Sequence, residues 1–132
     1  MILGVDLGQK TTGVAISEGV LASSYTTITH KSVSDAAAKI AQICDRVHAD
    51  KVILGFVEGK IKSQFENFAR GLKRLKPDLE ITFWDETLTT RQAISTMIKL
   101  QVPKIKRAQK EHEIAASIIL QSYLDSQWLK KF

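Results

Sequence analysis

The chain has 132 residues, of which 44% are hydrophobic and 25% charged, a composition typical of one globular domain of roughly 100–150 residues. We therefore expect a single domain over residues 1–132. Nineteen Lys and Arg against fourteen Asp and Glu give a net charge of +5, which favours a polyanionic partner or substrate.

Several classes of protein are excluded at this level. No apolar run approaches the roughly 18 residues that a membrane-spanning helix needs. The N-terminus has neither the basic nor the apolar region of a signal peptide, so a cytoplasmic protein is expected. The single cysteine, Cys44, excludes an internal disulfide and a structural zinc site of several cysteines. Any metal must therefore be held by oxygen and imidazole ligands.

The first part of the chain is predicted to form an antiparallel meander. Residues 2–6 are a short apolar run that ends in an acid, and residues 13–17 are again apolar, which is typical of the two buried strands of a hairpin. Residues 21–29 are rich in β-forming side chains and predict a third strand. After a capping box that begins at Ser32, apolar residues recur at helical spacing as far as residue 49.

The rest of the chain alternates strands with helices. Residues 51–57 are mostly apolar, as in a central parallel strand that is buried on both faces. The further elements expected are a helix over 61–75, a strand over 80–84, a helix that begins near Thr89 and, after Pro103 and a basic connector, a final helix over 114–124. This order predicts an α/β fold, in which a mixed five-stranded sheet of three antiparallel and then parallel strands carries helices on both faces.

Acidic side chains follow three of the predicted strands. Asp6 closes the first strand, Glu58 closes the fourth, and Asp85 and Glu86 close the fifth. Because binding sites in α/β sheets form at the carboxyl ends of strands, these acids are candidates to converge in space. Crowded carboxylates need a cation among them, and oxygen ligands suit Mg²⁺ or Mn²⁺. The alternative is that each acid is solvated or caps the following helix.

The turn after the first strand has the glycine spacing of a phosphate-binding P-loop, over Gly8–Gly13. It lacks the Lys and the Ser or Thr that must follow, and a strand comes next instead of a helix, so a P-loop is excluded. What remains is Asp6 followed by a tight turn, in which the amides, Lys10 and Thr11 are candidate phosphate contacts. The alternative is an ordinary hairpin turn that uses glycine for its backbone angles.

Four segments of the chain resemble a known family. They are ILGVDLGQKTTGVAIS at residues 2–17, VILGFVEGK at 52–60, DETLTT at 85–90 and EIAASIILQSYL at 113–124. In this order, and over nearly the whole chain, these motifs resemble the YqgF/RuvX family of pre-16S rRNA nucleases and Holliday-junction-resolvase-like proteins. The resemblance implies a ribonuclease-H-like fold, a two-metal-type nuclease site and a cytoplasmic role in rRNA maturation.

Two positions depart from the family pattern. Glu58, in a connection shorter than the family usually has, looks like the second carboxylate of RuvC-type resolvases. His112 stands where the family has an acid in its final helix, and its imidazole suits Mn²⁺ better than Mg²⁺. The alternative for His112 is a surface histidine near the start of a helix. The metal ligands that the resemblance implies are Asp6, Glu58, Glu86, His112 and Glu113. The catalytic set that it implies is Asp6, Glu58, Asp85, Glu86 and His112.

Basic side chains gather in the predicted connector before the final helix. The candidates there for contacts with phosphate are Lys104, Lys106, Arg107 and Lys110. Each phosphate that such a side chain neutralises steepens the salt dependence of binding. The alternative is a solvated connector. His30 and His48 have no comparable support, so we expect both at the surface.

The function expected from these features is hydrolysis of phosphodiester bonds in nucleic acid by an endonuclease that depends on Mg²⁺ or Mn²⁺. The resemblance makes processing of the 5′ end of pre-16S rRNA the first substrate hypothesis. One alternative is a resolvase that acts on branched DNA as a homodimer. The other is a nucleic-acid-binding factor without catalysis, which the histidine at position 112 keeps open.

Overall fold

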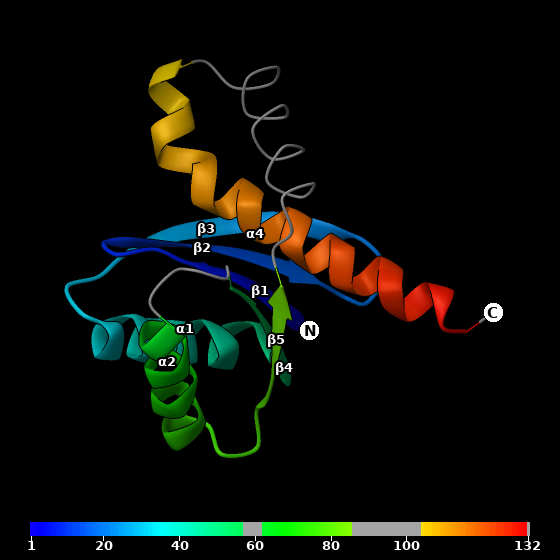
Figure 1. Ribbon diagram of the computed structural model, residues 1–132, viewed down its shortest axis with the longest axis horizontal. Helices are drawn as coiled ribbons and strands as arrows, with labels where there is room; N and C mark the ends of the chain where they lie inside the picture. Colours follow the sequence, from blue (N-terminus) through cyan, green and yellow to red (C-terminus); the bar gives the residue numbers. More distant parts are fainter. Residues whose placement is uncertain (57–61, 86–103, 132) are drawn as a thin grey trace.

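The structure is a computed structural model that describes residues 1–56, 62–85 and 104–131 (Figure 1). Its strands are β1 (Ile2–Leu7), β2 (Thr11–Ser17), β3 (Ala22–Thr29), β4 (Lys51–Phe56) and β5 (Glu80–Asp85). Its helices are α1 (Val33–Val47), α2 (Lys62–Leu75) and α4 (Lys104–Leu129). The helix expected to begin near Thr89 lies outside the described residues.

The strands form one mixed sheet in the order β3-β2-β1-β4-β5. β1 pairs antiparallel with β2, and β2 pairs antiparallel with β3, whereas β4 runs parallel to both β1 and β5. This confirms the predicted antiparallel meander followed by parallel strands. Val52, Ile53 and Leu54 of β4 are fully buried, as expected for a strand that is covered on both faces.

The sheet separates two hydrophobic cores. Side chains alternate along β1, so Leu3 and Val5 point to one face while Gly4 and Asp6 point to the other. On the first face, Leu3 and Val5 pack with buried residues of α1 and α2. α4 crosses the second face, as Figure 1 shows, and forms a separate core there with β2 and β4. Helices therefore cover both faces, as predicted, and Asp6 faces α4.

The ends of α1 follow directly from its sequence. Ser32 is the N-cap, and its Oγ accepts a hydrogen bond of 3.1 Å from the backbone N–H of Asp35. The Asp35 carboxylate accepts from the N–H of Lys31, one residue earlier than in a strict capping box. At the other end, His48 adopts the left-handed conformation with φ 57° and is exposed, which confirms its expected surface position.

α4 begins ten residues earlier than predicted. The segment interpreted as a basic connector is helical from Lys104, and Figure 1 shows these first turns rising away from the sheet. The prediction started the helix at residue 114 because it relied on apolar side chains, which are sparse before that point. Lys, Arg, Gln, Ala and Glu are strong helix formers, and no Gly or Pro interrupts them. No helix in the described part of the chain is long and apolar enough to span a membrane.

His30 is buried, so its expected place at the surface is wrong. Only 5% of the residue is exposed, and its Nε2 lies 2.7 Å from the hydroxyl of the fully buried Thr12. Its backbone N–H donates to the carbonyl of Lys10 over 2.9 Å, which ties the end of β3 to the β1–β2 turn. No apolar pattern in the sequence marks this position, because a hydrogen bond to a residue 18 positions away brings the imidazole inside.

Burial lowers the pKa of His30 below the ordinary value of 6.5, although the Asp35 carboxylate acts in the opposite direction. The folded protein therefore keeps this imidazole neutral at a pH where the unfolded chain protonates it, so stability falls as the pH drops below 6.5. We expect the free energy of unfolding in urea to decline more steeply between about pH 7.5 and about pH 5 in the wild type than in His30→Asn. The difference amounts to about 1.4 kcal/mol for each unit by which the pKa is lowered. Equal declines of the free energy of unfolding in the two proteins would contradict a lowered pKa of His30 in the folded state.

Candidate active site

Asp6 lies near the carboxyl end of β1, the strand at which the sheet changes from antiparallel to parallel pairing. It is in register with Gly13 on β2 and with Gly55 on β4. Both neighbours lack a side chain, so the carboxylate stands alone in its row between the two adjacent strands. Its side chain is 19% exposed, which makes it accessible without leaving it fully hydrated.

His112 of α4 lies directly on this carboxylate. Its Nδ1 is 2.8 Å from Oδ2 of Asp6, across a separation of 106 residues. An ionised carboxylate can only accept a hydrogen bond, so Nδ1 carries the proton and donates it. The imidazole is 34% exposed. The ring is thus in contact with the strand-end acid, and its role in catalysis or metal binding stays a prediction.

The β1–β2 turn packs closely against the same imidazole. A methyl group built on Gly8 would lie 3.1 Å from Cε1 and 3.2 Å from Nε2 of His112, and 2.3 Å from the carbonyl oxygen of Thr11. Only glycine fits this position without displacement of the turn or the ring. The turn, β1 and α4 thus meet around one hydrogen-bonded pair.

Glu113 points away from Asp6. Its carboxylate accepts a hydrogen bond of 2.9 Å from the hydroxyl of Thr27 on β3, the strand beyond β2. The metal-ligand role expected for Glu113 stays a prediction beside this observed contact with Thr27. Asp85, the last residue of β5, is exposed and lies two strands from Asp6.

The donors at this point fit part of a divalent-metal site. A carboxylate with a second oxygen and an adjacent imidazole are ligand types that Mn²⁺ accepts, whereas Mg²⁺ prefers oxygen alone. The described residues contain no group of three or more His, Cys, Asp or Glu that could hold a metal ion. The two other predicted ligands, Glu58 and Glu86, lie outside the described residues, two positions after β4 and one position after β5.

The predicted phosphate contacts lie on two elements beside the pair. Lys10 is exposed in the β1–β2 turn, and Thr11 begins β2 with a partly buried side chain. Lys104, Lys106, Arg107 and Lys110 belong to the turns of α4 that precede His112, and the described structure covers their backbone positions but not their side chains. The turn with Lys10 therefore follows Asp6 along the chain, and the four basic residues of α4 precede His112 on the same helix.

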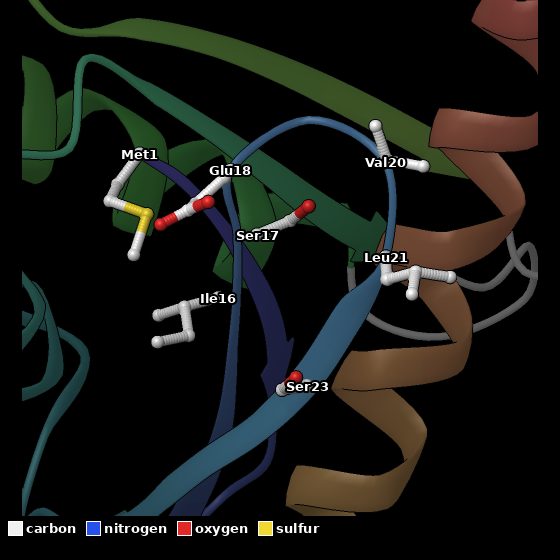
Figure 2. Close-up of a pocket in the computed structure, with 7 residues that line it drawn as sticks. All are labelled: Met1, Ile16, Ser17, Glu18, Val20, Leu21 and Ser23. Atoms are coloured by element: carbon white, nitrogen blue, oxygen red, sulfur yellow. The ribbon is translucent and has the colours of Figure 1, made fainter.

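A surface hollow of about 400 Å³ lies at the opposite end of the sheet. Figure 2 shows Met1, Ser17 and Leu21 among the residues around it. Ser17 is in register with Ile2, whereas Gly13 is in register with Asp6, so the hollow is four residues along the strand from Asp6, or roughly 13 Å. It is a separate feature and not part of the site around His112.

Comparisons with known proteins identify the family of the chain. The family described as "RuvX: Holliday junction resolvase" matches residues 1–126. The chain belongs to the RuvX family. A relative from Caldanaerobacter subterraneus subsp. tengcongensis is 40% identical over 134 residues, with 96% of each chain covered. Another from Clostridium botulinum (strain Hall) is 37% identical over 132 residues, with 95% of this chain and 96% of the relative covered. Both bear the name "Putative pre-16S rRNA nuclease".

Solved structures share the fold of this RuvX family member. Thermus thermophilus RuvC in complex with a Holliday junction substrate matches with a TM-score of 0.62 at 11% identity, over 96% of this chain and 94% of that one. Fowlpox virus resolvase with substrate junction DNA gives 0.62 at 15% identity, over 96% and 97%. A manganese-soaked human cytomegalovirus terminase nuclease domain gives 0.54 at 13% identity, over 93% and 82%. The predicted ribonuclease-H-like fold is confirmed.

Two residues of the site were not singled out from the sequence. Gly13 was noted only as the end of a turn and the start of the second predicted strand, and Thr27 was covered only by the range of the third. Each matters because of what α4 places on it, since the backbone of His112 lies on Gly13 and the carboxylate of Glu113 lies on Thr27. No spacing rule connects Gly13 with His112, 99 residues later, or Thr27 with Glu113, 86 residues later.

Proposed function

We propose that this RuvX family member is a divalent-metal-dependent endonuclease that processes the 5′ end of pre-16S rRNA. The observation that carries the proposal is the Asp6–His112 pair, which joins the end of the central strand β1 to the last helix at 2.8 Å. A partly exposed carboxylate at this edge of an α/β sheet is placed to hold a cation against a substrate phosphate. The names of the relatives from Caldanaerobacter and Clostridium support pre-16S rRNA as the substrate.

Asp6, Glu58 and Glu86 are the carboxylates that would hold Mg²⁺ or Mn²⁺ in this proposal, with Asp85 at the edge of the cluster. A bound divalent metal supplies activation of a water molecule and stabilisation of the leaving oxygen. Asp6 contributes the negative charge at the end of β1. His112 holds a proton at Nδ1 and thereby fixes one carboxylate oxygen of Asp6 in a single orientation.

The basic residues of the β1–β2 turn and of the first turns of α4 would contact phosphates on either side of the scissile bond. Lys10 lies in the turn that packs against His112, and Thr11 follows it as the first residue of β2. The other four basic candidates belong to the same helix as His112, which rises away from the sheet (Figure 1). The net charge of +5 favours such a polyanionic substrate. Activity on pre-16S rRNA would place the protein in the cytoplasm.

Resolution of branched DNA is a second candidate function. It is favoured by the fold shared with Thermus RuvC and with the fowlpox resolvase, both solved with Holliday junctions. A resolvase needs two sites that cut symmetric strands, so this candidate requires a homodimer in solution.

A cleavage assay separates these functions. The protein is incubated with a pre-16S RNA fragment and with a four-way DNA junction, each in Mg²⁺ and in Mn²⁺, and its mass in solution is measured. We expect cleavage of the RNA at a defined 5′ position. Cleavage of the junction alone, by a dimer, favours the resolvase. Tight binding with neither substrate cut in either metal would leave a nucleic-acid-binding factor without catalysis.

Asp6→Asn tests the carboxylate. Asparagine keeps the shape of the side chain and an oxygen that can accept from His112, but it removes the charge that attracts a cation. We expect cleavage to fall by roughly a hundredfold or more while the midpoint of thermal unfolding changes little. Retention of full activity by a folded Asp6→Asn protein would remove this residue from the mechanism.

Substitution of His112 tests why an imidazole replaces the usual acid. We expect wild-type activity to be higher with Mn²⁺ than with Mg²⁺, because Nδ1 of His112 faces Asp6 and its other ring nitrogen, Nε2, is a donor type that Mn²⁺ tolerates beside oxygen ligands. His112→Asp should shift the preference towards Mg²⁺, and His112→Ala should lower activity with both metals. The measurement is the ratio of kcat/KM in the two metals. An unchanged ratio and rate in His112→Ala would show that the imidazole has no part in the reaction.

Neutralisation of the basic turns tests phosphate binding. A fourfold variant with Gln at Lys104, Lys106, Arg107 and Lys110 should bind all RNA sequences more weakly and flatten the slope of log K against log salt by up to about 3, as expected for four lost contacts with a single strand. The control neutralises four exposed residues elsewhere, namely Lys31, Arg46, Lys130 and Lys131. The same slope in both variants would identify the first set as a solvated helix surface.

A further inference from the structure

One turn of α4 contacts three neighbouring strands at once. The imidazole of His112 meets Asp6 on β1, and the carboxylate of the next residue, Glu113, meets Thr27 on β3. Between them the helix backbone lies on Gly13 of β2. Asp6, Gly13 and Thr27 are in register, so the three contacts form a straight row across the sheet.

The middle contact leaves the least room for a side chain among the glycines of the described structure. A methyl group built on Gly13 would lie 1.9 Å from both the carbonyl carbon and the carbonyl oxygen of His112, and 2.4 Å from the backbone nitrogen of Glu113. These are helix backbone atoms, which cannot turn aside as a side chain can. To reach 3.4 Å, where ordinary contact begins, the turn would have to retreat by about 1.5 Å.

Other glycines make less rigid or more distant contacts. A methyl group on Gly55 would meet the end of the Ile119 side chain at 2.5 Å, and one on Gly4 would meet Leu120 at 2.7 Å and the carbonyl of Ala116 at 2.8 Å. Gly71 of α2 has room, with its nearest neighbour, Ala37, at 3.4 Å. Among these, only Gly13 bears directly on the backbone of His112.

The outer contact holds the same turn from the other side. The hydroxyl of Thr27 donates to Oε2 of Glu113 over 2.9 Å, in a partly buried position. A hydrogen bond to a charged acceptor is stronger than one between neutral groups, so it resists rotation of the turn about the helix axis. Rotation of the turn in either direction would carry the imidazole of His112 with it and lengthen its hydrogen bond to Asp6.

We infer that Gly13 and Thr27 are positioning residues for the proposed reaction, and that Glu113 acts as their anchor rather than as a metal ligand. Gly13 sets the height of the helix turn above the sheet, and Thr27 sets its rotation through Glu113. Together they place Nδ1 of His112 at 2.8 Å from Asp6. The inference rests on the proposed function for its role in catalysis, although the geometry that it describes can be measured on the metal-free protein.

The first experiment compares Gly13→Ala with two controls, Gly71→Ala and Gly4→Ala. For Gly13→Ala we expect kcat to fall roughly tenfold to a hundredfold with little change in KM, since a shift of about 1 Å in a catalytic group has effects of this size. Gly71→Ala should match the wild type. Gly4→Ala should lower the midpoint of thermal unfolding, but its kcat should fall far less than that of Gly13→Ala. Equal losses of kcat in Gly4→Ala and Gly13→Ala would overturn the inference.

A double-mutant cycle separates positioning from general damage. If Gly13 acts through His112, then Gly13→Ala should cost little further activity in a His112→Ala background, so the two losses should be strongly non-additive. Additive losses would mean that Gly13 supports the fold and not the imidazole, which would overturn the inference.

Thr27→Val tests the outer contact and also serves if Gly13→Ala does not fold. Valine has nearly the shape of threonine and suits a strand, but it cannot donate to Glu113. We expect kcat to fall roughly threefold to tenfold, with rescue by Thr27→Ser. Glu113→Gln keeps an acceptor for Thr27 but makes it neutral, so we expect a weaker hydrogen bond and a smaller loss of kcat than in Thr27→Val. A large loss of Mn²⁺ affinity in Glu113→Gln would instead make Glu113 a metal ligand and overturn its assignment as an anchor.

Nitrogen NMR of the metal-free protein distinguishes failure of this inference from failure of the proposed function. The Nδ1 resonance of His112 should show the hydrogen bond to Asp6 in the wild type and in Gly71→Ala. It should move towards that of the exposed His48 in Gly13→Ala and Thr27→Val. Unchanged resonances in both variants would overturn the positioning role even if the protein is a nuclease. The expected changes in a protein that cuts no substrate would support the positioning role and reject the proposed reaction.

Discussion

The hydrogen bond between Asp6 and His112 depends on how closely α4 can approach the sheet. A helix packed on a sheet through ordinary side chains would hold its backbone too far away for a histidine at this position to reach a strand-end aspartate so directly. Small residues beneath α4, above all Gly13, remove that layer of side chains. The large apolar residues of α4 lie further along the helix, where Ile119, Leu120 and Tyr123 belong to the core on this face of the sheet.

For this reason one face of the sheet contributes mainly to stability, and the other holds the candidate site. On one face, α1 and α2 cover a core of large aliphatic and aromatic residues, among them Ile40, Phe68 and Leu72. That core supplies most of the apolar burial and tolerates polar chemistry only at its margin, where His30 meets Thr12. On the other face, the helix that the described part of the chain provides is α4, which combines a smaller core with the polar pair. The site therefore depends on the position of one element, while stability is shared among several.

The bounds of an element could be predicted from the sequence where a run or a repeat of apolar residues marks it. Strands β1, β2 and β4 are runs of apolar residues whose ends are fixed by turns or acids, and the structure has them within two residues of the predicted bounds. The start of α4 was missed because its first turns are helical by intrinsic preference and not by an apolar stripe. His30 was misplaced because a polar side chain is buried here by one specific partner, and such pairing leaves no periodic trace.

The candidate site was predictable to a similar degree. The acid at the end of β1 follows from the rule for α/β sheets, and its partnership with His112 was reached only through the family pattern, since 106 residues separate the two. The direction of Glu113 could not be foreseen. Two adjacent helical residues differ by about 100° in direction, so the pattern that places one of them on Asp6 says nothing of what its neighbour meets.

The long separation in sequence between Asp6 and His112 determines how late the pair forms during synthesis and folding. The hairpin of β1 and β2 joins residues close in sequence and is quick to form, whereas the contact with α4 closes one of the longest loops in the chain. During synthesis the strands emerge first and the helix with the histidine emerges late. A partly made or partly folded chain therefore lacks the assembled pair of groups, and a protein proposed to cut RNA would stay inert until its last helix has docked.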